Sequence, residues 1–149
     1  MKFNPTVRKA SLIDARQLAE LNGALGYPVE TEAIQKRLEQ LLPRANHVVF
    51  VAEIAPDNVI GWIQGEEREI LAIGRFCEIV GLVVSEAHRG AGVGRQLVNA
   101  VEEWAAGRGL PQVSLRSNIV RPESHAFYEK VGYSRFKTQH AYRKRLGET

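Results

Sequence analysis

The sequence predicts a single mixed α/β domain whose sheet is partly antiparallel. Three observations point to this class: two segments with helical apolar spacing come early, a Pro-Asp-Asn turn joins two strand-like segments, and a buried strand-like run leads through a glycine cluster into a helix. The expected order is a strand, two helices, three strands, a helix, a strand, a helix and a final strand. The 149 residues make one domain, 1–149, because about 150 residues can bury a core of their own.

The first third of the chain is typical of a short strand followed by two helices. Residues 6–9 can form the strand. Ser11, with Asp14 three residues later, opens a helix with an apolar stripe, and a Gly-Tyr-Pro sequence ends it. Thr31 can cap a second helix, which stops at Pro43.

The middle of the chain predicts three strands. Residues 47–54 and 59–64 are rich in apolar and β-branched side chains, and the turn between them indicates a hairpin. The nearly continuous apolar run at 76–84 suits a central strand that is buried on both faces.

The last third predicts a helix, a strand, a short helix and a strand-like end. Apolar residues from Val93 onward recur at helical spacing until glycines near 107 end the helix. Residues 112–116 would form the next strand, and Ser124 would cap a short helix. Residues 133–145 would supply one or two final strands.

Composition and charge argue against several classes of protein. Apolar residues make up 44% and charged residues 25% of the chain, which is typical of a globular domain. The net charge of +3 is too small to indicate nucleic-acid binding. No apolar stretch has the length of a signal peptide or a membrane span, so we expect a cytoplasmic protein. The single cysteine, Cys77, lies among apolar neighbours, which predicts a core position.

Three glycines in five positions follow the central strand, in Arg89-Gly90-Ala91-Gly92-Val93-Gly94-Arg95. Backbone N–H groups at a helix start lack internal partners, and glycine lets a phosphate approach them. A dinucleotide fingerprint would need glycine at Arg95, and the Gly-Lys-Ser/Thr of a P-loop is absent. The simpler alternative is a turn that only lets the helix pack tightly. We therefore expect a phosphate-bearing ligand other than these two nucleotide types.

Two motifs resemble those of the GNAT superfamily of acyl-CoA N-acyltransferases. The family signature is Arg or Gln, two residues, Gly, one residue, then Gly or Ala, and Arg89, Gly92 and Gly94 match it. Residues 126–133, Ala-Phe-Tyr-Glu-Lys-Val-Gly-Tyr, are similar to the family's second motif, and Asn118 matches its downstream asparagine. The element order fits the family over the whole chain.

The resemblance implies a fold, a co-substrate and a binding surface. The fold would be a mixed, mostly antiparallel central sheet flanked by helices. The co-substrate would be acetyl-CoA, with its pantetheine arm between two central strands and its pyrophosphate in the glycine loop. The residues implied as its binding site are Leu82, Val83, Val84, Arg89, Gly90, Ala91, Gly92, Val93, Gly94, Arg95, Asn118 and Tyr128.

The family reaction, attack of a neutral amine on the thioester, needs a base and an acid. Tyr128 occupies the family's tyrosine position and can protonate the departing thiolate, unless it is simply an aromatic core residue. The family often takes its base from the strand before the motif, which makes Glu78 the candidate. Alternation places Glu78 on the same face as Leu82 and Val84, and a carboxylate in an apolar run needs a reason. A solvated carboxylate, or one paired with Arg75, is the alternative.

Polar residues after the strand at 112–116 and near the C-terminus are candidates for acceptor binding, with simple solvation as the alternative. They are Arg116, Ser117, Asn118, Arg121, His125, Gln139 and His140. His125 is a second candidate base. An acidic group could attract a cationic amine, although a solvated hairpin loop is the simpler interpretation; it consists of Glu66, Glu67 and Glu69. No HExxH motif or Cys/His set with metal spacing occurs, so we expect no catalytic metal.

The sequence therefore predicts an N-acetyltransferase that transfers the acetyl group of acetyl-CoA to a primary amine of a small molecule, such as an aminoglycoside, a polyamine or an amino acid. Two alternatives stay open: an enzyme that acetylates a protein N-terminus or lysine, and a non-catalytic acyl-CoA-binding sensor. Homodimers are common in the family, so a homodimer is possible. We expect neither a nucleic-acid nor a membrane partner.

Overall fold

The computed structural model describes residues 4–24, 26–117 and 122–147. They group into two compact units, Met1–Arg116 and Ser117–Thr149. The first unit holds the whole sheet and three of the four α-helices of the described chain. The prediction of one domain over 1–149 stays a prediction.

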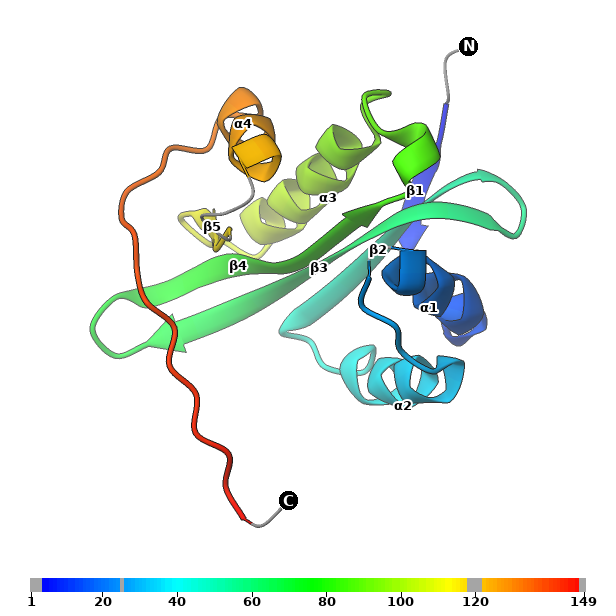
Figure 1. Cartoon of the computed structure of the whole chain (residues 1–149). Helices are drawn as coiled ribbons and strands as arrows, with labels where there is room; N and C mark the ends of the chain where they lie inside the picture. Colours follow the sequence, from blue (N-terminus) through cyan, green and yellow to red (C-terminus); the bar gives the residue numbers. More distant parts are fainter. Residues whose placement is uncertain (1–3, 25, 118–121, 148–149) are drawn as a thin grey trace. The chain divides into compact units, whose positions relative to one another are not determined.

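The first unit is built on a five-stranded sheet in the order β1-β2-β3-β4-β5 (Figure 1). The strands are β1 (Thr6–Lys9), β2 (His47–Ala55), β3 (Asn58–Ile70), β4 (Gly74–Val84) and β5 (Val113–Leu115). All neighbours pair antiparallel except β4 and β5, which pair parallel. The predicted mixed, mostly antiparallel sheet is confirmed.

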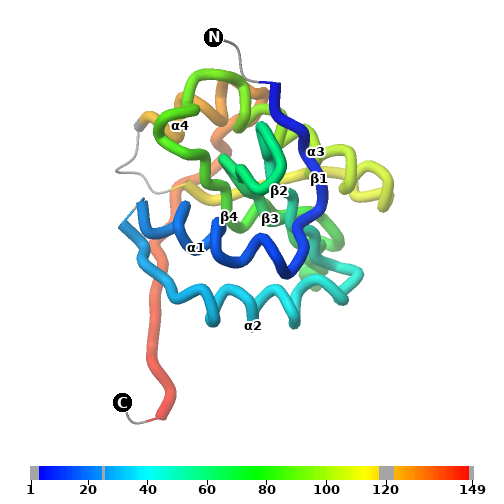
Figure 2. Tube along the Cα trace, turned by 90° about the vertical axis from the view of Figure 1, so that its right-hand side faces the viewer, coloured from blue at the N-terminus to red at the C-terminus, as the bar shows by residue number. Residues whose placement is uncertain are grey.

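Helices cover both faces of this sheet. A short 3-10 turn, η1 (Leu12–Asp14), leads into α1 (Ala15–Ala24), and α2 (Thr31–Leu41) follows. Figures 1 and 2 show α1 and α2 side by side on one face, while α3 (Val93–Gly107) lies on the other. The sheet is therefore buried between two helical layers, which explains its apolar central strands.

The α1 side of the core is closed by apolar packing and two hydrogen bonds. Leu18 and Leu38 belong to one buried cluster with Val51 of β2. The Gln17 side-chain oxygen accepts a hydrogen bond from the Val59 amide at 2.7 Å. The indole N–H of Trp62 donates to Asn22 at 3.2 Å. These bonds fix α1 across β3.

Two glycines of β3 bring α3 close to the sheet. A Cβ at Gly61 would lie 3.2 Å from the Leu97 side chain, and one at Gly65 would lie 3.0 Å from that of Val101. Leu97 and Val101 are completely buried. Because only glycine leaves this room, the two positions set how closely the helix packs.

An ion-pair network ties β1 to the start of the helical layer. Arg8 donates two hydrogen bonds to Asp14, at 2.8 and 2.9 Å, and pairs with Glu53 of β2 at 3.1 Å. The Ser11 amide also donates to Asp14, at 2.8 Å. Burial by itself would raise the pKa of Asp14, but the hydrogen bonds from Arg8 and Ser11 hold that pKa below its ordinary value.

The β3–β4 hairpin is longer than the sequence predicts. Residues 65–70 continue β3 and pair with 74–79 of β4, so the acidic residues at 66, 67 and 69 lie in a strand and the predicted loop is wrong. Cross-strand ion pairs explain the difference, because they compensate the charges in the strand. Arg68 pairs with Glu78, and Arg75 pairs with Glu67.

Two predicted helix caps are also displaced. Glu30 precedes α2 at the capping position, and Thr31 is the first helical residue. Helix α4 (Pro122–Lys130) begins before Ser124, which lies inside it. Proline suits the first helical position because its missing N–H would have no partner there.

The second unit contains α4 and an extended C-terminal segment. The Tyr133 amide donates to the Tyr128 carbonyl at 2.9 Å, which closes the end of α4. The described residues after 132 form no strand, so the predicted final strand over 133–145 is wrong. A strand requires a neighbouring strand to pair with, and no described strand pairs with this segment.

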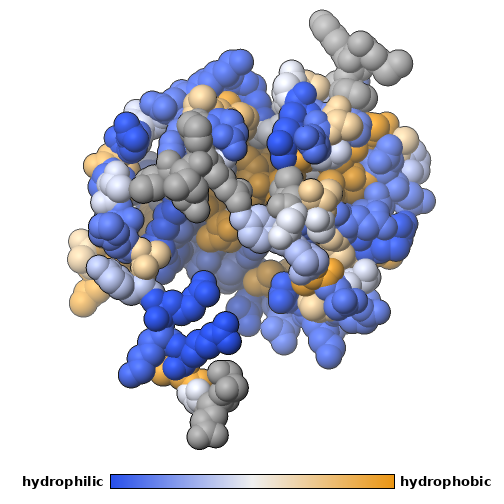
Figure 3. Space-filling model, in the orientation of Figure 1, coloured by the Kyte–Doolittle hydropathy of each residue, from blue (hydrophilic) through white to orange (hydrophobic). Residues whose placement is uncertain are grey.

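The face of the molecule drawn in Figure 3 is mostly hydrophilic, with smaller apolar patches. Among the described residues, no helix combines the length and the apolar character needed to cross a bilayer.

Candidate functional site

The second half of β4 carries a free backbone edge. Gly65 pairs with Ile79 and Gln64 with Gly81, so Val80 is an extra residue that makes a β-bulge. The parallel pairing with β5 ends at Ile79 and Leu115. From Val80 to Val84 the strand is therefore paired with β3 alone, and within the described residues its other edge has no strand beside it. Such an edge offers backbone N–H and C=O groups to a ligand.

The bulge also changes which β4 side chains share a face. Glu78 lies opposite Glu66, whereas Leu82 lies opposite Ile63. Opposed residues point to the same face, and positions 63 and 66 of β3 point to opposite faces. Glu78 therefore does not share a face with Leu82 and Val84, and the prediction from strict alternation is wrong.

The glycine loop follows a short 3-10 turn, η2 (Glu86–His88), at the end of this edge. Gly90 has a φ of 80°, and Gly92, which precedes α3, has a φ of 85°. Other residues rarely adopt this left-handed conformation. A Cβ at either position would meet no protein atom within 4 Å. Close helix packing is therefore not the reason for these two glycines, and their backbone is open to a ligand.

Two cations flank the loop at the start of α3. Arg89 and Arg95 are both exposed, and neither side chain makes a hydrogen bond or ion pair with another described residue. The first N–H groups of a helix and its dipole attract anions, and two guanidinium groups add to that attraction. Val93 is buried against the sheet and anchors the first turn. The loop can hold a pyrophosphate on its backbone.

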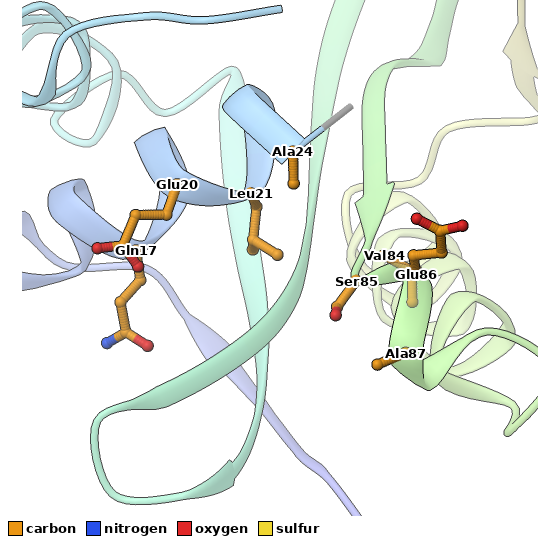
Figure 4. A pocket seen from close by; sticks show the side chains of 8 residues that line it. All are labelled: Gln17, Glu20, Leu21, Ala24, Val84, Ser85, Glu86 and Ala87. Atoms are coloured by element: carbon orange, nitrogen blue, oxygen red, sulfur yellow. The ribbon is translucent and has the colours of Figure 1, made fainter. Parts of the chain in front are cut away.

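A cavity of about 210 Å³ lies between α1 and the end of β4. Figure 4 shows residues of α1 on one side and residues 84–87 on the other. Leu21 and Ala24 contribute apolar surface, while Glu20 and Glu86 are carboxylates at its border. Glu20 forms an exposed ion pair with Arg16 at 2.8 Å. The cavity has room for a small polar or cationic group.

Glu78 lies two residues before the free edge, where β4 still pairs with β5, on the α1 face of the sheet. Its side chain is 11% exposed, and its Oε1 accepts a hydrogen bond from Arg68 at 2.8 Å. Arg116 is more distant, 3.9 Å from Oε2. The predicted alternative of a pair with Arg75 is wrong, because Arg75 donates to Glu67 at 2.9 Å. The ion pair with Arg68 raises the pKa of that arginine.

Tyr128 belongs to α4 in the second unit. Its ring makes edge contacts with Phe127 at 5.2 Å and Tyr133 at 6.2 Å, between ring centroids. Burial raises the pKa of Tyr128 above its ordinary value, so the phenol keeps its proton at neutral pH. A protonated phenol is the form that a general acid requires.

The remaining predicted site residues fall in the second unit or outside the described residues. Asn118 and Arg121 lie outside the described residues. His125 lies within α4, and Gln139 and His140 lie in the exposed C-terminal segment. Ser117 is half-buried at the start of the second unit.

Cys77 and the acidic residues give no sign of a metal centre. Cys77 is completely buried, which confirms its predicted core position, and burial raises the pKa of its thiol to about 11. The thiol is therefore protonated and a poor metal ligand at neutral pH. In the described ranges, no three His, Cys, Asp or Glu side chains gather where they could hold a metal ion.

Sequence reasoning missed the residues that complete the site around β4. The sequence does not pair Arg68 with Glu78, because the predicted strand 59–64 ends before Arg68. For the residues lining the cavity, the sequence predicts only a helix stripe and a connecting loop. A hydropathy pattern carries no signal for either role, since both depend on which segments the fold brings together.

Comparisons with known proteins place the chain in one family. The sequence pattern of the Acetyltransferase (GNAT) family matches residues 15–133. Glucosamine 6-phosphate N-acetyltransferase 1 of Oryza sativa subsp. japonica is 34% identical over 110 residues, which are 71% of this chain and 65% of that protein. Aminoglycoside N(6')-acetyltransferase type 1 of Stenotrophomonas maltophilia is 29% identical over 133 residues, 87% of this chain and 86% of that protein. The chain thus spans slightly less than two thirds of the first of these relatives.

A solved structure shares the fold over almost the whole chain. The aminoglycoside N-acetyltransferase AAC(6')-Iy in complex with CoA superposes with a TM-score of 0.85 at 20% identity, over 98% of each chain. At this identity the likeness concerns the fold alone. It supports a mixed sheet with helices on both faces as the arrangement common to the two proteins.

Proposed function

The chain belongs to the acetyltransferase (GNAT) family and is an acetyltransferase, and from this premise we propose that it transfers the acetyl group of acetyl-CoA to a primary amine of a small molecule. The observation that supports the proposal most is the order in which three features follow one another along the chain: the free edge of β4, the glycine loop and the start of α3. A long ligand with amides at one end and phosphates at the other fits this order of backbone groups.

The two ends of acetyl-CoA would use different parts of this surface. The amides of the pantetheine arm would pair with the backbone of 82–84, where β4 lacks a second neighbour. The pyrophosphate would lie on the N–H groups of 89–95, between Arg89 and Arg95. Asn118 would add a polar contact further along, as the family motif implies. A solved relative by fold binds CoA itself.

The chemistry needs a proton acceptor for the amine and a proton donor for the thiolate, and Glu78 and Tyr128 are the proposed groups. Glu78 would accept a proton from the acceptor ammonium, so that the nitrogen lone pair can attack the thioester carbonyl. As the carbon–sulfur bond breaks, the thiolate would take the proton of the Tyr128 hydroxyl, and the nitrogen would give up its second proton, through solvent, to the Tyr128 phenolate as the amide forms. The raised pKa of Tyr128 keeps that proton in place until the thiolate forms.

The acceptor is proposed to be a small cationic amine. The relatives named above include an aminoglycoside acetyltransferase and a glucosamine 6-phosphate acetyltransferase. The cavity beside α1 is small, and the carboxylates of Glu20 and Glu86 suit a positively charged acceptor. A protein N-terminus or lysine as acceptor, and a binding function without catalysis, are the alternatives. A cytoplasmic location and a homodimer remain predictions.

A panel of amines tests the proposal. Wild-type protein is mixed with acetyl-CoA and, in separate reactions, with aminoglycosides, polyamines, amino sugars, amino acids and lysine-containing peptides, and the released CoA thiol is followed. Turnover with a small amine supports the proposed function. Turnover with peptides alone would favour the protein-modifying alternative, and binding of acetyl-CoA without any turnover would favour the sensor.

A further inference from the structure

The β3–β4 hairpin carries two arginine–glutamate pairs, one on each face of the sheet. Arg68 Nη1 lies 2.8 Å from Glu78 Oε1, and Arg75 Nε lies 2.9 Å from Glu67 Oε2. Positions 68 and 78 lie on the α1 face, whereas 67 and 75 lie on the α3 face. The two pairs have similar geometry, yet only one of them includes a residue next to the free edge of β4.

The surroundings of the two carboxylates differ. Glu67 accepts a second hydrogen bond, from Arg108 at 2.8 Å, so both of its oxygens are engaged. Glu78 accepts a hydrogen bond through Oε1 alone among the described residues, and Arg116 stays 3.9 Å from its Oε2. The other groups facing Glu78 across the sheet are Glu66, directly opposite on β3, and Ser114, opposite on β5.

We infer that Arg68 is a positioning residue for Glu78: it holds Oε1 and leaves Oε2 to accept the proton of the acceptor amine. The inference rests on the proposed function, in which Glu78 is the base. An ammonium N–H bond breaks, its electron pair stays on nitrogen, and the proton moves to Oε2. After acetyl transfer, Glu78 returns that proton to water.

Two physical effects make the pair useful for such a base. A carboxylate that is largely removed from water tends to take up a proton and lose its charge, and a neighbouring guanidinium opposes this. Arg68 also lies 3.9 Å from Glu66, so its one positive charge faces two carboxylates. A fixed Oε1 also restricts the rotation of the carboxyl group, so Oε2 has a constant direction.

The test compares the pH dependence of kcat/KM in the wild type with that in Arg68→Gln, Arg68→Lys and the matched control Arg75→Gln. The acceptor is the amine that turns over fastest in the panel, and its own ionisation is divided out. Arg68→Gln removes a charge that stabilises ionised Glu78, so the acidic limb of the profile moves to higher pH. The expected shift is about one pH unit, which lowers kcat/KM about tenfold on that limb.

The controls separate positioning from a general structural role. Arg68→Lys keeps the charge but loses the planar guanidinium, so it should restore most of the profile. Arg75→Gln breaks the equivalent pair on the other face and should leave the profile unchanged. Melting temperatures of all variants, with and without acetyl-CoA, report folding and cofactor binding. Across the variants, these temperatures should not correlate with the displacement of the acidic limb. An NMR titration of the Glu78 side-chain carbonyl, assigned with Glu78→Gln, should show the same displacement in Arg68→Gln without any acceptor.

The possible failures are distinguishable. In one outcome the wild type turns over an amine, while Arg68→Gln has the same pH profile and the same NMR titration as the wild type. That result would overturn the positioning role and leave the proposed function intact. Equal shifts in Arg68→Gln and Arg75→Gln would overturn it as well, because the effect would then be general. Normal turnover in Glu78→Gln would show that Glu78 is not the base. A wild-type protein that acetylates none of the amines would overturn the proposed function. Either result would also overturn the inference about Arg68.

Discussion

Gly92→Val is expected to abolish acetyl-CoA binding by closing the backbone surface before α3. Gly92 has a φ of 85°, and a Cβ there would meet no protein atom within 4 Å. A new side chain therefore has two effects: strain in the left-handed backbone, about 1–2 kcal/mol for an ordinary L-residue, and obstruction of the ligand. Obstruction is the effect that the proposed site predicts.

Gly109→Val is the matched control for the strain. Gly109, just beyond the other end of α3, has a φ of 74°, and a Cβ there would also meet no protein atom within 4 Å. Both variants should lose about 1–2 kcal/mol, which corresponds to roughly 2–8 °C in Tm for a chain of this size. The difference between them then reports on the ligand alone.

The assay is thermal unfolding with and without acetyl-CoA. At a hundredfold excess over Kd, a ligand that binds only the folded protein stabilises it by about 2.7 kcal/mol, an increase of roughly 5–11 °C. Wild type and Gly109→Val should show this increase, and Gly92→Val should show none. An equal increase in all three proteins would refute the placement of the pyrophosphate at Gly92. Loss in both variants would show that strain alone disturbs binding.

Three further predictions concern the proposed acid, the packing beside the bulge and the ion-pair network. Tyr128→Phe should lower the turnover of the best acceptor about a hundredfold, while the increase in Tm on adding acetyl-CoA stays unchanged. If turnover stays near the wild-type rate where the chemical step is rate-limiting, Tyr128 only packs in the structure and is not the acid. Gly81→Ala should lower the stability in urea by about 1–3 kcal/mol, because its Cβ would lie 2.7 Å from the Trp62 ring, and an unchanged midpoint would contradict that packing. Asp14→Asn should remove part of the acid sensitivity of folding. Because the pKa of Asp14 is lowered in the folded protein, its carboxylate stabilises the fold above about pH 4 and loses this effect as the pH falls further. The free energies of unfolding of the wild type and Asp14→Asn, measured from about pH 3 to 7, should therefore converge at the acid end. Parallel curves over that whole range would exclude Asp14 as the source.

The glycine loop was predictable because its chemistry constrains the residues. Positive φ at Gly90 and Gly92 leaves glycine as the favoured choice, and the helix after them has an apolar stripe that can be read directly. The strands were predictable for the same reason, since β-branched runs and a turn at 56–58 mark them. Local requirements leave local signatures in the sequence.

The environment of Glu78 could not be predicted in the same way. The sheet face on which Glu78 lies relative to Leu82 and Val84 depends on the bulge at Val80. Position 80 is neither glycine nor proline, so the sequence does not indicate the extra residue. The partner of Glu78, Arg68 rather than Arg75, follows from the cross-strand register, which extends beyond the predicted hairpin. The prediction of a final strand is wrong for a similar reason, because the residues after 132 have a strand-like pattern but no neighbouring strand in the described chain. Each of these features is decided by a partner distant in sequence.

The most direct test of the proposed function is the stoichiometry of acetyl transfer. Wild-type protein is incubated with acetyl-CoA carrying a labelled acetyl group and the best amine of the panel, and NMR follows the labelled amide while a thiol reagent follows free CoA. One acetylated amine for each CoA released is the predicted result, with neither product formed by Gly92→Val. Release of CoA without acetylated amine would contradict transfer to an amine, and formation of both products at the wild-type rate by Gly92→Val would contradict the proposed site.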